Sequence, residues 1–140
     1  MPAKDPTDAI QLGVYTLLSA DAPLIALADI YDGVPEGAEP DYVVIGEVTA
    51  IPDGVHGLEG RQTSFSLHTW TRSEGYAPGN VIAARLVALL WHRHANLDAL
   101  VAGHKVWRVD HEFAQTIDDP EPGMRHRIDR FRVWSHQEAQ

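Results

Sequence analysis

Residues 62–72 read Gln-Thr-Ser-Phe-Ser-Leu-His-Thr-Trp-Thr-Arg, and this stretch indicates the fold. Phe65, Leu67 and Thr69 alternate with mostly polar residues, so a β-strand here would have one apolar face and one largely polar face. A sheet that is apolar on one face needs helices packed against that face. We therefore expect an α+β architecture built around this strand.

The covering helix is expected shortly after the strand, over residues 79–92. An apolar stripe recurs there at helical spacing and consists of Ile82, Leu86, Leu89 and Leu90. A second helix is expected over residues 6–19, because Asp5 as N-cap and Pro6 at the first helical position are typical of a helix start. Asp21 begins a further short turn of helix. These helices supply the layer that the sheet requires.

Three further strands complete the expected sheet. Residues 42–51 are rich in β-branched side chains, and Gly46 within them indicates a bulge or a close approach to the backbone. Residues 106–114 and 125–135 flank a turn and are expected to form an antiparallel hairpin. The expected fold is a single α+β domain over residues 1–140. Its mainly antiparallel four-stranded sheet has helices packed on one face, in the order α-β-β-α-β-β.

Charge is distributed unevenly along the chain. Residues 1–60 contain eleven acidic residues and one basic residue, whereas residues 61–140 contain ten basic and nine acidic residues. The whole chain has a net charge of −9, opposite in sign to a typical nucleic-acid-binding domain. Copies that meet head to tail would place the acidic part of one against the basic part of the next. Two separate solvated faces are the alternative interpretation.

Composition also excludes several classes of protein. The chain contains no cysteine, which excludes disulfides, cysteine-rich metal sites and a thiol nucleophile. The longest nearly apolar run, residues 81–91, is shorter than the ~20 residues that cross a bilayer. The N-terminus lacks the apolar core of a signal peptide. We expect no membrane association.

The histidines are the main candidates for chemistry, and their spacing does not indicate a catalytic or metal site. His68 and His126 could approach each other across neighbouring strands, but no third ligand is indicated. His111 is expected beside Trp107 and Phe113 on the apolar face of its strand, as a partly buried histidine with satisfied hydrogen bonds. A nucleophile elbow and a phosphate-binding glycine loop are also missing. We expect no enzyme, no cofactor and no metal.

Two segments are candidate interfaces instead. The loop after residues 42–51 is longer than a tight hairpin needs and carries apolar side chains among polar ones. Its candidate residues are Asp53, Val55, His56, Leu58 and Glu59. The last strand supplies the basic candidates Arg125, Arg127, Arg130 and Arg132. Contact with a partner and folding back onto the domain are both open for the loop.

Several phrases, taken together in this order, resemble the tail completion or tail terminator family of long-tailed bacteriophages and gene transfer agents. They are Ile-Tyr-Asp-Gly-Val-Pro at 30–35, Pro-Asp-Tyr-Val-Val-Ile-Gly-Glu at 40–47, Ser-Leu-His-Thr-Trp-Thr at 66–71, the helix at 79–90 and Arg-His-Arg-Ile-Asp-Arg-Phe-Arg at 125–132. The resemblance covers about residues 8–135 and departs from the family's pattern at 54–60 and at the turn from Asp118.

The resemblance implies a non-enzymatic virion protein that is assembled in the host cytoplasm. In this family a ring, usually of six copies, caps the tail tube and presents its opposite surface to the head-proximal stopper or connector. DNA passes through the lumen without sequence-specific binding. An acidic wall suits that passage, because basic side chains would bind phosphate, and acidic residues between 36 and 60 are the candidates for it.

Two alternatives remain open from the sequence. Another neck component, such as the stopper, would share the same general features. A small hydrolase or a ligand-binding α+β domain is the alternative from a different class. A deep pocket that joins His68, His126 and an acid would favour that third interpretation.

Overall fold

Nine elements make up the computed structural model, which describes residues 4–54 and 58–138. In chain order they are α1 (Thr7–Ser19), α2 (Ala22–Ile25), β1 (Asp29–Tyr31), β2 (Tyr42–Pro52), β3 (Gly60–Arg72), α3 (Ala77–Leu90), α4 (His94–Asp98), β4 (His104–Asp118) and β5 (Met124–Gln137). The strands form one sheet in the order β1-β2-β3-β5-β4. The α+β class is confirmed.

The expected number of four strands is wrong, because the sheet is mixed and has five strands. Strands β2, β3, β5 and β4 are antiparallel neighbours, and β4 and β5 form the predicted hairpin. The additional strand β1 lies parallel to β2, with Asp29 opposite Tyr42 and Tyr31 opposite Val44. It spans only three residues, too few to show an alternating pattern in the sequence.

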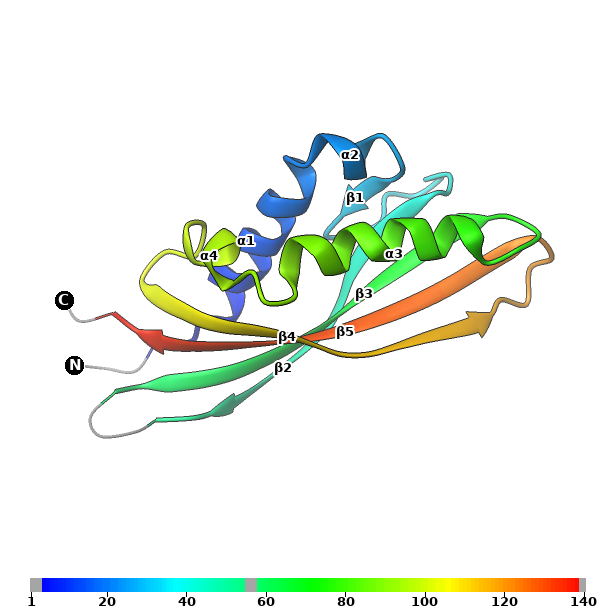
Figure 1. Cartoon of the computed structure of the whole chain (residues 1–140). Coiled ribbons are helices and arrows are strands. Elements are labelled where there is room, and N and C mark those ends of the chain that lie inside the picture. The colour runs from blue at the N-terminus through cyan, green and yellow to red at the C-terminus, as the bar shows by residue number, and fades with distance from the viewer. Residues whose placement is uncertain (1–3, 55–57, 139–140) are drawn as a thin grey trace.

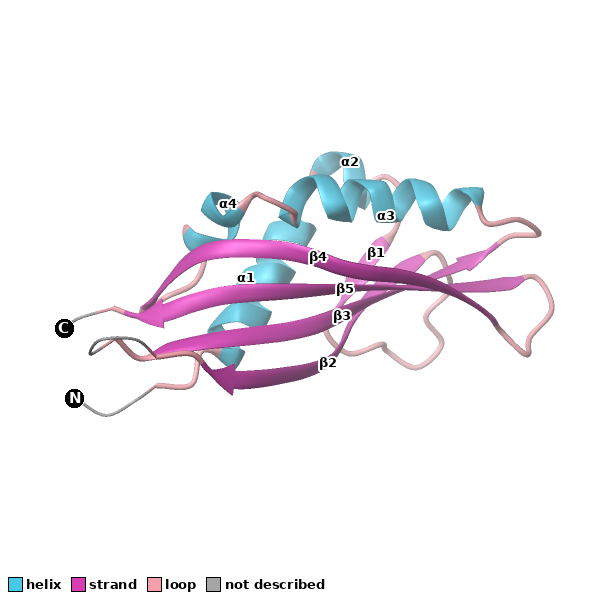
Figure 2. Cartoon of the chain, turned by 60° about the horizontal axis from the view of Figure 1, so that its bottom comes forward, coloured by secondary structure: helices cyan, strands magenta, loops and turns pink. Residues whose placement is uncertain are grey.

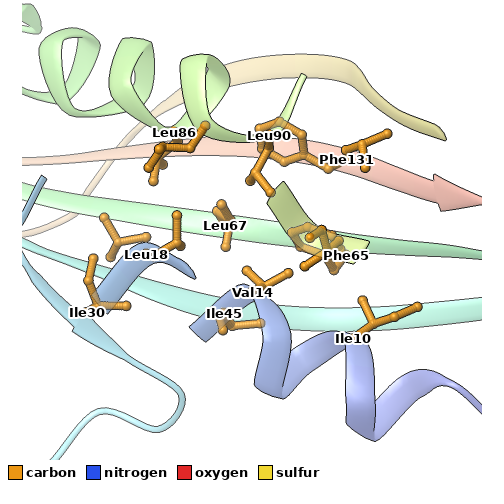
Figure 3. Close-up of a cluster of buried hydrophobic side chains, with 14 of the residues drawn as sticks. Ile10, Val14, Leu18, Ile30, Ile45, Phe65, Leu67, Leu86, Leu90 and Phe131 are labelled. Carbon is orange, nitrogen blue, oxygen red and sulfur yellow. The ribbon is translucent and has the colours of Figure 1, made fainter. Parts of the chain in front are cut away.

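The helices lie together above one face of the sheet, and no helix of the described residues covers the other face (Figures 1 and 2). Side chains from α1, α3 and the central strands fill the space between the two layers (Figure 3). Phe65 of β3 and Phe131 of β5 stack there with ring centroids 5.7 Å apart. Leu67 of β3, which the sequence places on the apolar face, is fully buried. We call the side of the sheet without helices the open face.

The helix starts differ slightly from the expected ones. Pro6 takes the N-cap position of α1, while the carboxylate of Asp5 accepts hydrogen bonds from the backbone and hydroxyl of Thr7. Asp21 caps α2 as predicted, with Oδ2 accepting a 3.0 Å hydrogen bond from Leu24 N–H. Helix α3 begins at Ala77, two residues before the predicted start.

Bulges in β4 overturn the predicted facing of its side chains. The register shifts between Val106 and Arg108 and again between His111 and Phe113. Each extra residue interrupts the two-residue alternation of the strand. Val109 and His111 therefore face the helices, whereas Trp107 and Phe113 are 45% and 46% exposed. The prediction that Trp107 and Phe113 share a face with His111 is wrong.

The predicted irregularity at Gly46 is confirmed. The register between β2 and β3 shifts between Ile45 and Val48. A Cβ atom at Gly46 would lie 2.5 Å from the imidazole of His68, so only glycine fits without displacing that ring. The bulge thus clears the space that His68 occupies.

Candidate functional site

The predicted interface loop lies at one end of the sheet, beside the end of β5. Asp53 N–H donates to Gly60 O at 2.9 Å, and Gln137 N–H donates to Glu59 O at 2.8 Å. Leu58 is 48% exposed. Val55 and His56 lie outside the described residues. The described part of the loop is thus attached to the sheet while its leucine stays open to contact.

An open hollow of about 450 Å³ lies against this loop. Its lining residues are Asp53, Leu58, Gly60, Trp107, Ser135 and His136. Trp107 reaches it because the first β4 bulge turns the indole away from the helices. The hollow combines two exposed apolar side chains, Leu58 and Trp107, with polar groups at its border. Sequence reasoning placed Trp107 in the interior and missed this pairing.

The four candidate arginines do not form one patch, because the pleat of β5 divides them between the two faces of the sheet. Arg125 and Arg127 lie on the helix side, and Arg130 and Arg132 lie on the open face. The separation follows from the two-residue period of a strand, since the members of each pair are two residues apart and the pairs are three residues apart.

The helix-side arginines have partners within the fold. Arg127 binds the carboxylate of Asp129 through Nε at 3.0 Å and Nη2 at 3.1 Å, and it reaches Asn80 of α3 at 2.9 Å. Asp129 is fully buried and also accepts from Nε2 of His111 at 2.9 Å. The prediction of His111 as a partly buried, hydrogen-bonded histidine is confirmed. Arg127 therefore neutralises a buried charge.

Arg125 connects β5 to the segment before α3. Its Nη2 donates to Glu74 O at 2.7 Å, and its guanidinium lies 5.2 Å from the ring centroid of Tyr76. Tyr76 in turn donates its hydroxyl to Asp118 at 2.8 Å, and this bond raises the pKa of the Tyr76 phenol. The contact fixes the entry of the chain into α3.

The open-face arginines are held more loosely. Arg130 donates to the hydroxyls of Ser66 at 3.1 Å and Thr49 at 3.0 Å, and no carboxylate in the described part of the chain pairs with it. Arg132 donates to Gln62 at 2.8 Å and lies 3.2 Å from a carboxylate oxygen of Glu112. Arg130 thus presents a positive charge on the open face that the fold itself does not neutralise.

The predicted approach of His68 and His126 is confirmed. Nδ1 of His68 lies 2.7 Å from Nε2 of His126, and Nε2 of His68 lies 3.1 Å from Oε2 of Glu47. Trp70 stacks on His126 with centroids 3.8 Å apart. Burial, and then the neighbouring His68, lower the pKa of His126. The chain of contacts links β2, β3 and β5 across the open face.

The hollow beside this histidine cluster is small. The hollow that His126 borders has a volume of about 10 Å³, room for roughly one water molecule. In residues 4–54 and 58–138, no three side chains of the ligating types come together as a metal site.

The acidic residues before β2 are mostly exposed. Glu36 makes none of the ion pairs recorded between described residues, and Glu39 lies 4.0 Å from Arg72. Asp41 accepts a 3.0 Å hydrogen bond from Arg72 N–H. The negative charge of the N-terminal part is therefore available at the surface.

No helix among the described residues is long and apolar enough to span a bilayer.

An exposed apolar hollow and unneutralised charges of both signs are typical of proteins that assemble with other chains. Residues 13–136 match the family described as "Tail completion protein gp17", and the chain belongs to that family. It is a structural protein of the virion tail. Among curated proteins, none matches this chain.

A solved structure supports the same assignment. The chain is similar to one in "Virion of native gene transfer agent (GTA) particle", with 25% identity and a TM-score of 0.84. The similarity covers 96% of this chain and 99% of that one. The resemblance inferred from the sequence is confirmed, and so is the place of the protein in a virion.

Proposed function

We propose that this chain is a tail terminator, which closes a ring of six copies over the finished tail tube. The opposite surface of the ring meets the head-proximal stopper or connector, and DNA crosses the lumen. The observation that carries the proposal is the similarity to a virion chain over nearly the full length of both chains. A domain that shares the fold of that chain over this length is suited to the same structural task, and we propose residues 1–140 as a single domain.

The terminator and the stopper differ in the defect that their loss produces. Loss of a terminator gives overlong tail tubes, because nothing stops polymerisation. Loss of a stopper gives filled heads that leak DNA beside finished tails. Deletion of the gene, followed by electron microscopy of tail lengths, therefore tests the proposal. Tails of normal length in the deletion would reject it.

Ring closure requires a surface on one copy to meet a different surface on the next. Arg130 and Arg132 on the open face are the proposed basic contacts, and the acidic residues between 36 and 60 are the proposed complement or the rim of the channel. Lysine in place of Glu36 and Glu39 would then slow DNA exit through added phosphate binding. Unchanged ejection kinetics would argue against an acidic rim.

The loop hollow is the proposed contact with the tube or with a neighbouring copy. Leu58→Asp, or the same change at Val55, introduces a charge into that contact, so we expect fewer completed tails while the purified chain stays folded. Leu27→Asp is a matched control, because Leu27 is 40% exposed and Leu58 is 48% exposed. Equal tail completion by Leu58→Asp and Leu27→Asp would remove the loop from the interface.

A further inference from the structure

The outer edge of β4 has hydrogen-bond partners along its first half and, among the described residues, none along its second half. We call this second half, Phe113 to Ile117, the bare edge of β4. Asp98 of α4 accepts a 2.8 Å hydrogen bond from Val106 N–H, and His92 N–H donates to Val109 O at 3.1 Å. From Phe113 to Ile117 the strand carries no charged residue, and all of these residues are exposed. Among the described residues, none outside β5 makes a backbone hydrogen bond with this stretch.

The opposite edge of the sheet repeats this division. Strand β1 covers β2 only from Tyr42 to Val44, and the bulge at Gly46 and Glu47 follows. The next four residues, Val48 to Ile51, are uncharged and pair only with β3 within the described structure. Edge strands left with unpaired backbone groups and no charge or bulge readily pair with another chain.

Backbone polarity shows which residues of β4 point outward. The backbone N–H of Val106 and the backbone carbonyl of Val109 bond to groups outside the sheet. The backbone groups of these two residues, which lie opposite Ser135 and Val133, therefore point away from β5. Residues of an antiparallel strand alternate in this respect. Within the second half of β4, Ala114 and Thr116 also lie opposite odd-numbered residues of β5. Their backbone N–H and C=O groups therefore point outward too.

The same alternation extends to β2. Val133, which points away from β4, must bond to its opposite residue Thr63 in β3, so Thr63 points toward β5. Ala50 lies opposite Thr63 and therefore points outward, as does Val48 two residues earlier. Each bare edge thus offers two outward-facing residues with an amide N–H and a carbonyl.

We infer that neighbouring copies join by pairing the bare edge of β4 with the bare edge of β2, which makes a sheet that continues from one subunit to the next. This inference rests on the proposed ring and identifies the contact between its neighbouring copies. β2 and β4 run in opposite directions within one sheet, so the new pair is antiparallel. Val48 pairs with Thr116 of the next copy, and Ala50 pairs with its Ala114.

A second copy is the partner that these edges fit. The two bare stretches belong to opposite edges of one sheet, so their contact is heterologous and can close a ring, whereas β4 against β4 would stop at a dimer. Within one subunit, the register through β3 and β5 places Ala50 in the same row of the sheet as Val109. Pairing of Ala50 with Ala114 of the next copy therefore shifts that copy along the strand direction. The displacement is about four residues, on the order of 13 Å. Such a stagger is what tilts strands in closed sheets.

Disulfide cross-linking tests the inference directly, because the chain has no cysteine of its own. In the inferred register Ile51 lies opposite Phe113 of the next copy, in a pair without mutual hydrogen bonds, whose short Cα separation suits a disulfide. Assembled particles that carry Ile51→Cys with Phe113→Cys should give a ladder of cross-linked chains on a non-reducing gel. Each single variant should stay monomeric.

The matched control is Ile51→Cys with Ala114→Cys, which places the second thiol on the opposite face of the sheet. We expect at least tenfold less cross-linking from it. A dimer from Phe113→Cys alone, or no ladder in particles with tails of normal length, would overturn the edge pairing and leave the terminator role intact. Normal tails after deletion of the gene would reject the terminator role instead.

A proline variant gives a second measurement. Ala114→Pro removes an outward N–H and leaves the hydrogen bonds between β4 and β5 in place, so the monomer should fold and the number of completed tails should fall. Unchanged tail completion by this variant would also overturn the inference.

Discussion

Arg127 and Arg130 lie three residues apart on β5, and the same substitution should cost the fold much more stability at Arg127 than at Arg130. Arg127→Ala leaves the fully buried carboxylate of Asp129 with only the imidazole of His111 beside it. Removing one partner of a buried ion pair costs about 3–5 kcal/mol, and the remaining donor favours the lower end. Arg130→Ala removes hydrogen bonds to two neutral hydroxyls and should cost about 1 kcal/mol.

Denaturant unfolding of the purified chain measures both changes. We expect Arg127→Ala to lose about 3 kcal/mol of unfolding free energy, or roughly 10 °C in Tm for a domain of this size. Arg130→Ala should unfold almost like the parent protein and complete fewer tails. If the two variants lost the same stability, or if Arg127→Ala were the more stable, the division of these arginines between fold and interface would be refuted.

Two further predictions concern Gly46 and the histidines His104 and His126. Gly46→Ala should cost about 1–3 kcal/mol because its Cβ would displace the ring of His68, whereas Gly75→Ala, which meets nothing within 4 Å, should be nearly neutral in the same denaturation assay. Burial is the main cause that lowers the pKa of both His104 and His126 in the folded chain below 6.5, the ordinary pKa of histidine. The free energy of unfolding should therefore fall as the pH drops below 6.5. The unfolded chain then binds protons that the folded chain does not, until the pH reaches the lowered folded pKa values. His126→Gln should flatten part of that decline in unfolding titrations from pH 7.5 to 5, and an unchanged slope would contradict the assignment.

Local patterns were sufficient for several features. The alternation around Phe65 and Leu67 predicted a sheet with one apolar face, and the stripe from Ile82 to Leu90 predicted a covering helix. Gly46 predicted the bulge. These features depend on neighbours two to four residues apart, so the printed sequence contains the whole signal.

Other features depend on residues that are distant in the sequence. The two bulges of β4 arise from its register against β5, and they move Trp107 to the loop hollow and Phe113 to the bare edge. The two-residue period of β5 separates Arg127 from Arg130. The role of Arg127 depends on Asp129, whose burial is set by the helices packed above it.

The sequence by itself determined the class of fold, the acidic N-terminal part and the membership of a tail family, since each rests on composition, periodicity or the order of short phrases. Only the tertiary structure decided the fifth strand, the partners of each arginine and the two bare edges. The physical reason is that pairing between strands fixes which backbone groups and charges are already satisfied, and the groups left unsatisfied are the ones available to another subunit.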